Sequence, residues 1–178
     1  MSVDTGRAGD QLLLLMKGRF CGQNAVATFL GWQQEARLTH FISYASEDID
    51  YAHALFNAIK QAECDVWMDK PPEPYQFDGL CAGQNWANVI EERIVNACRI
   101  WLVLSPVSVA KTGFVQREFR LALDQMNDMP DDQVFVTPVL TEECEVPNLR
   151  VGHIQLSDIH WEIVPIDQIP DYIANRLG

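Results

Sequence analysis

The chain of 178 residues has little positive charge: 13 Lys and Arg stand against 25 Asp and Glu, and the formal net charge is −12. Such a charge repels the phosphates of nucleic acids and anionic lipid headgroups. No local basic patch offsets it. We therefore expect no direct nucleic-acid partner and no membrane partner.

Cysteine pairing and long apolar runs are missing as well. The five cysteines are odd in number and form no CxxC pair, which argues against a disulfide framework and favours the cytoplasm. The four histidines show no metal-ligand spacing, so no metal site is expected. The run Leu12–Met16 is too short to span a bilayer, and no signal-peptide cleavage site follows it.

Two further absences narrow the class of protein. No Gly-rich phosphate loop occurs, and no acidic cluster of the receiver type follows the first predicted strand. A phosphate-loop nucleotide binder and a phosphate-accepting receiver are therefore disfavoured.

The chain divides into an extension, residues 1–36, and a domain, residues 37–178. Leu12–Met16 and Ala25–Trp32 in the extension are apolar enough to be helical, and Gly18, Gly22 and Gly31 interrupt them. The extension either packs on the domain, which we favour, or serves as an arm for oligomerisation or partner docking.

Strand and helix patterns alternate through the domain, as in βαβ units. We predict an α/β fold with a five-stranded parallel sheet, whose strands are Leu38–Tyr44, Asp65–Met68, Ile100–Leu104, Val134–Leu140 and Ile154–Leu156. Helices are predicted after Ser46, after Asn85, over Phe114–Met126 and over Ile166–Leu177. Ligands of such sheets bind beyond the carboxyl ends of the strands.

Ser46 and Asn85 are the residues we expect to cap the first two helices. The buried face of the second helix is predicted to comprise Trp86, Val89, Ile90, Ile94 and Ala97. Between these helices lies a long loop at 70–84, KPPEPYQFDGLCAGQ. Loops this long in small domains are usually functional, and this one leaves from the ligand-binding edge. A solvent-exposed insertion without a role is the alternative.

Five segments, in order, resemble TIR (Toll/interleukin-1 receptor) domains. They are HFISYASED at 40–48, VWMDK at 66–70, GQNW at 83–86, WLVLSPVSV at 101–109 and GFVQREFRLAL at 113–123. The resemblance runs from about residue 38 to 149. It implies a flavodoxin-like three-layer fold, which agrees with the alternation of strands and helices.

The resemblance implies one of two activities. Many TIR domains, bacterial ones among them, cleave NAD⁺ into nicotinamide and ADP-ribose or a cyclic isomer, in antiviral defence or cell-death signalling. NAD⁺ is then the substrate, and no cofactor is expected. Other TIR domains are catalytically silent adaptors that assemble with one another. We favour the NAD⁺-cleaving type and keep the adaptor as the alternative.

Glu118 matches the catalytic glutamate of the family. Nicotinamide leaves NAD⁺ as a neutral molecule, so one carboxylate that stabilises the ribose cation is a sufficient minimum. Phe114, four residues earlier, lies on the same helical face, where the family usually has Trp. Without the resemblance, Glu118 would be interpreted as a surface acid paired with Lys or Arg.

Other site residues carry over from the same motifs. Tyr44 and Ala45 match the substrate-facing end of the first strand, although many members have a basic residue at the position of Ala45. Asp69 either binds substrate or caps the loop. Ser105 either binds substrate or bonds its own backbone in a turn.

Self-association is the remaining implication. In the family a loop called the BB loop, here residues 70–84, reaches a neighbouring copy and completes its cleft. The residues assigned to this loop and to assembly are Tyr75, Phe77, Gly79, Gly83 and Trp86. The trigger is expected from a separate sensor protein, from a small-molecule-triggered partner or from the extension.

Overall fold

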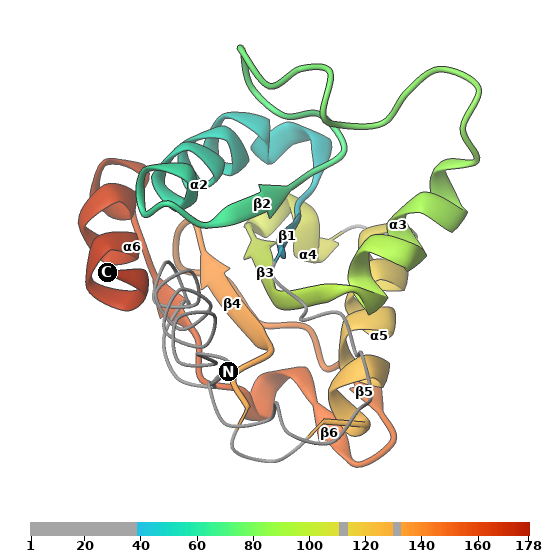
Figure 1. Cartoon of the computed structure of the whole chain (residues 1–178). Helices are drawn as coiled ribbons and strands as arrows, with labels where there is room; N and C mark the ends of the chain where they lie inside the picture. The colour runs from blue at the N-terminus through green and yellow to red at the C-terminus, as the bar shows by residue number, and fades with distance from the viewer. Residues whose placement is uncertain (1–38, 111–113, 130–132) are drawn as a thin grey trace, which may run out of the picture.

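A five-stranded parallel sheet organises the domain (Figure 1). The computed structural model describes residues 39–110, 114–129 and 133–178, and the side chains of 114–116 lie outside the description. The strand order is β2 (Asp65–Trp67), β1 (Thr39–Ser43), β3 (Ala97–Leu104), β4 (Val136–Leu140) and β7 (Glu162–Ile163). The predicted fold class is confirmed. The predicted extension, residues 1–36, lies outside the described residues.

The prediction of the fifth strand is wrong. Ile154–Gln155 forms β6, which pairs antiparallel with β5 (Arg150–Val151) in a separate hairpin. Gly152 at the turn of that hairpin has φ +59°, a conformation that glycine adopts without strain. Ile154–Gln155 therefore pairs within this local hairpin, and β7 occupies the edge of the sheet beside β4.

Helices cover both faces of the sheet (Figure 1). On one face lie α2 (Ile49–Gln61) and α6 (Ile169–Leu177), and on the other α3 (Trp86–Val95) and α5 (Phe114–Asn127). Short helical turns complete the connections: η1 (Ser46–Asp48), α4 (Pro106–Ala110), η2 (Leu156–Asp158) and η3 (Ile166–Gln168). No described helix is long and apolar enough to cross a membrane.

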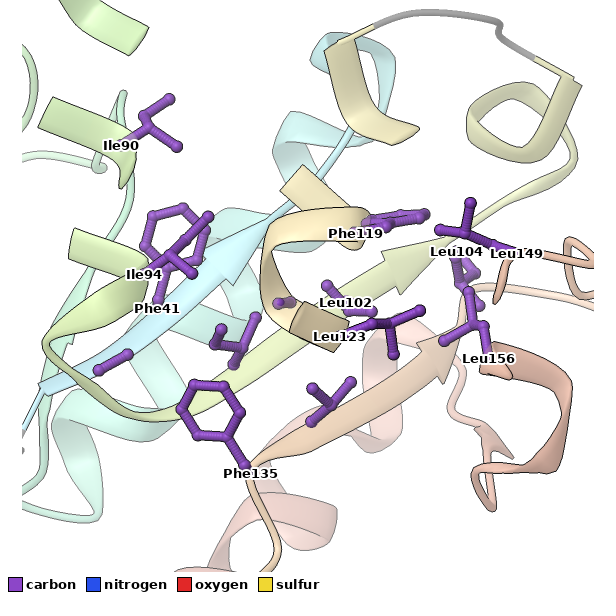
Figure 2. Packing of buried hydrophobic residues seen from close by; sticks show 14 of the residues in the cluster. Phe41, Ile90, Ile94, Leu102, Leu104, Phe119, Leu123, Phe135, Leu149 and Leu156 are labelled. Carbon is purple, nitrogen blue, oxygen red and sulfur yellow. The ribbon is translucent and has the colours of Figure 1, made fainter. Parts of the chain in front are cut away.

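Strand β3 supplies the core on both of its faces. Leu102 and Leu104 pack with Phe119 of α5, whereas Trp101 and Val103 pack on the α2 and α6 side. Figure 2 shows the first cluster, in which Phe119 and Leu123 of α5 lie over Leu102 and Leu104. This two-sided burial explains why residues 100–104 of β3 form an unbroken apolar run.

The predicted helix starts have mixed outcomes. The Oδ1 of Asn85 accepts hydrogen bonds from the backbone N–H groups of Ala87 (3.1 Å) and Asn88 (3.4 Å), so the predicted cap is confirmed. Ser46 is not a cap: it is the first residue of η1, and neither η1 nor α2 has a side-chain hydrogen bond at its cap. Ser46 instead lies within the single turn of 3₁₀ helix that precedes α2.

The predicted buried face of the second helix needs two corrections. Ala97 is buried, but it belongs to β3, since α3 ends at Val95. Ile90 and Ile94 are buried and Val89 packs against them, but Trp86 is 44% exposed. Trp86 is the first residue of α3, directly after the long loop, so it lies beyond the part of the helix that covers the sheet.

The loop at 70–84 leaves the carboxyl end of β2 and projects away from the sheet (Figure 1). Its base is closed where the backbone N–H of Leu80 donates to the carbonyl of Asp69 at 2.9 Å. A Cβ at Gly79 would lie 2.4 Å from that carbonyl oxygen, so only glycine fits. Phe77, further out, is 84% exposed.

Candidate active site

Glu118 is carried by a well-anchored helix. Phe119 and Ala122 of α5 are buried in the core, which fixes the helix against the sheet. The side chain of Glu118 is directed into the protein, and the residue is only 5% exposed. The interpretation of Glu118 as a surface acid paired with Lys or Arg is therefore wrong.

Ser43 holds the Glu118 carboxyl group. Ser43 is the last residue of β1, and its Oγ donates a hydrogen bond to Oε2 of Glu118. Burial raises the pKa of Glu118 to about 8; the Ser43 hydrogen bond opposes this rise and the negative charge of Asp69 adds to it. Glu118 is therefore largely protonated at pH 7, and a small change in its surroundings would alter its charge.

Tyr44 and Asp69 form the neighbouring pair. The Tyr44 hydroxyl donates a hydrogen bond to Oδ1 of Asp69 at 2.7 Å. Burial first, and then the hydrogen bond and charge of Asp69, raise the pKa of Tyr44, so the phenol remains neutral. Tyr44, Asp69 and Glu118 are thus brought together at the carboxyl ends of β1 and β2, where the parallel sheet predicts a ligand site.

Ser105 lies in a hydrogen-bonded turn after β3. Its Oγ donates to Oδ2 of Asp48 at 2.7 Å and accepts from the backbone N–H of Ser108 at 3.0 Å. The Oγ of Ser108 in turn accepts from the backbone N–H of Ser105 at 2.8 Å. The alternative in which the Ser105 hydroxyl bonds the backbone of its own turn is confirmed, and a substrate-binding role for Ser105 stays a prediction.

The remaining predicted residues have different surroundings. The methyl group of Ala45 is buried in the core. Phe114 begins α5, and its side chain lies outside the described residues. Tyr75 packs on Phe56 with ring centroids 5.4 Å apart and is less exposed than Phe77. Substrate and assembly roles for these residues stay predictions.

Sequence reasoning places the segment Ser43–Asp48 at the ligand-binding ends of the strands but does not name Ser43 or Asp48 individually as site residues. Both lie in the HFISYASED segment, Ser43 at the end of the central strand and Asp48 in η1. The signal that could have found Ser43 is its register: it follows Phe41 by two residues and shares its face, the face that α5 covers.

The chain is thus an α/β domain with a parallel sheet, and a buried carboxyl group lies at the carboxyl ends of its strands, the edge at which sheets of this kind bind ligands. The family model described as TIR domain matches residues 41–169, and the chain belongs to the TIR domain family. A comparison with curated proteins gives no match.

Proposed function

We propose that this TIR domain cleaves the bond between nicotinamide and ribose in NAD⁺. The observation that carries the proposal is the Glu118 carboxyl group, buried at the strand ends and held by Ser43. A carboxylate in a site of low polarity stabilises a developing positive charge far better than one in water.

The reaction needs little from the protein. The C1′–N bond breaks, its electron pair goes to the pyridinium ring, and nicotinamide leaves as a neutral molecule. Ionised Glu118 would stabilise the ribose cation that remains. Water then attacks C1′ and releases one proton, which gives ADP-ribose; attack by a nitrogen of the adenine base instead gives a cyclic isomer.

The pKa of Glu118 sets the expected pH dependence. Because burial raises this pKa to about 8, the ionised form that stabilises a cation grows as pH rises. We expect nicotinamide release to increase between pH 6 and 9 with a midpoint near 8.

The test is nicotinamide release from NAD⁺, followed by chromatography at high protein concentration. Glu118→Gln keeps the shape and the Ser43 contact but cannot ionise, and we expect at least a 100-fold loss. Glu92→Gln, an exposed acid on α3, is the matched control and should keep the activity. Equal rates for Glu118→Gln and the native chain would move the catalytic role away from Glu118.

The second candidate is an adaptor that works by self-association, and the exposure of Phe77 favours it. Phe77 is 84% exposed on the projecting 70–84 loop, so its ring is accessible to a second copy of the chain. A catalytically silent adaptor would release no nicotinamide, but self-association as such is compatible with NAD⁺ cleavage if association completes the site. A rise of specific activity with protein concentration supports this combination, and concentration-independent activity of a monomer contradicts it.

A further inference from the structure

Ser43 has a fixed position in the sheet. It is the last residue of β1, which lies between β2 and β3, and it pairs with Leu102 of β3. The residue is buried, and a single torsion places its Oγ. The central strands of the sheet therefore determine where this hydroxyl group lies.

Glu118 needs such a support, because its side chain has three torsions and several rotamers of similar energy. One hydrogen bond holds the carboxyl group: Oγ of Ser43 donates to Oε2. The two residues are 75 positions apart, so the contact joins strand β1 to helix α5, and each element is anchored in the core on its own. The bond occupies Oε2 and leaves Oε1 as the oxygen that can contact a ligand.

The same contact acts on the ionisation of Glu118. A hydroxyl group donates a stronger hydrogen bond to a carboxylate than to a carboxylic acid. Burial raises the pKa of Glu118 to about 8, and the Ser43 hydrogen bond opposes that rise. Ser43 therefore supports the ionised form while carrying no charge of its own.

The charged and titratable groups on the elements around the site keep their charges when Ser43 is replaced. They are Tyr44 after β1, Asp48 on η1, Asp69 after β2, Glu91 and Arg93 on α3, Arg117 and Arg120 on α5, and Glu142 and Cys144 after β4. Asp48 bonds Ser105, and Asp69 bonds Tyr44. A neutral substitution of Ser43 thus tests the hydrogen bond to Glu118 without a change in the charge around it.

We propose that Ser43 is a positioning residue for Glu118: its hydroxyl group holds Oε2 at the strand ends, so that Oε1 is presented to the ribose of NAD⁺. Ser43 does not react with the substrate and acts only through the carboxyl group. This role rests on the proposed function, in which Glu118 stabilises the ribose cation. Loss of the hydroxyl group has two effects: the carboxyl group keeps its proton to higher pH, and the carboxylate loses its fixed orientation.

The effect on ionisation can be measured without substrate. The infrared difference between a chain and its Glu118→Gln counterpart isolates the absorption of this one carboxyl group as a function of pH. We expect Ser43→Ala to raise the titration midpoint by about one pH unit, and to move the C=O band of the protonated group to higher frequency, because the hydrogen-bond donor is removed. Ser157→Ala removes a hydroxyl group from an exposed position on η2 and should change neither. An unchanged midpoint in Ser43→Ala overturns the proposal.

Ser43→Thr separates the hydroxyl group from the packing around it. Thr keeps the hydroxyl group but adds a methyl group at a buried position, so it disturbs the packing more than Ala does. We expect its titration midpoint and C=O band to stay close to the native ones, even where its urea unfolding midpoint is lower. A folded Thr variant whose midpoint moves as far as that of Ser43→Ala overturns the role of the hydroxyl group.

Nicotinamide release separates this role from the proposed function. If the midpoint rises from about 8 to about 9, the ionised fraction of Glu118 falls about 10-fold at pH 7 and about twofold at pH 9. The loss of kcat in Ser43→Ala should therefore be about fivefold larger at pH 7 than at pH 9. Equal losses at the two pH values overturn the positioning role, since altered packing alone acts alike at both. A shifted titration without any release by concentrated native protein leaves the hold of Ser43 on the carboxyl group standing and refutes the NAD⁺-cleaving function.

Discussion

Replacing Glu118 by Gln is expected to stabilise the fold, and the gain should grow with pH. The folded chain holds the Glu118 proton up to about pH 8, whereas the unfolded chain releases it near the ordinary value of 4.5. Between these values the folded state binds more protons, so stability falls as pH rises. The carboxyl group is thus a source of instability that grows through this window.

The magnitude follows from the two pKa values. Retaining the proton against solvent costs about 1 kcal/mol at pH 5 and about 3 kcal/mol at pH 7. Gln cannot ionise and carries no such cost, while its amide oxygen can still accept from Ser43. We therefore expect the stability gained by Glu118→Gln to be about 2 kcal/mol larger at pH 7 than at pH 5.

Urea unfolding followed by tryptophan fluorescence measures this difference, because Trp67 and Trp101 are buried. Unfolding curves are recorded at pH 5, 6, 7 and 8 for the native chain, Glu118→Gln and Glu92→Gln. The exposed Glu92 serves as the control and should leave the pH dependence unchanged. A constant difference between Glu118→Gln and the native chain at all four values would refute the raised pKa and the reasoning built on it.

Three other predictions concern different parts of the molecule. Burial, and then the charge of Arg99, lower the pKa of His40 to about 4, so stability should fall as pH drops from 6.5 towards 4; His40→Asn should remove this acid sensitivity in urea unfolding. Asn85→Ala removes the cap of α3 and should lower the free energy of unfolding by about 1 kcal/mol, measured by urea unfolding at pH 7. Asn88→Ala, at an exposed position of the same helix, should lower it less. Phe77→Ser should weaken self-association in sedimentation experiments without lowering the thermal midpoint, and an unchanged association constant would contradict the loop's role in assembly.

The raised pKa of Glu118 also means that this side chain lowers the stability of the fold at neutral pH. A protein under selection for stability alone would have a neutral or apolar residue at a position that is only 5% exposed. Local conflicts of this kind are typical of functional positions. The cost is therefore consistent with the proposed function of Glu118.

Local patterns in the sequence were sufficient for most of the fold. The unbroken run of β3, the helical spacing of α2 and α5 and the cap of α3 each depend on neighbouring residues, and the structure confirms them. The weak fifth strand was misassigned, because Ile154–Gln155 and Glu162–Ile163 are both short and only the sheet edge decides which one pairs with β4.

The sequence by itself determined the α/β class, the TIR resemblance and the choice of Glu118 as the candidate catalytic residue. The tertiary structure alone decided the environment of that residue, because burial and charge at a point depend on segments far apart in the chain. Ser43 and Glu118 are 75 positions apart, and Tyr44 and Asp69 are 25 apart. The strand register could have indicated the face on which Ser43 lies, but only the tertiary structure brings it to Glu118 and buries the carboxyl group, and this burial is the main cause of the raised pKa of Glu118.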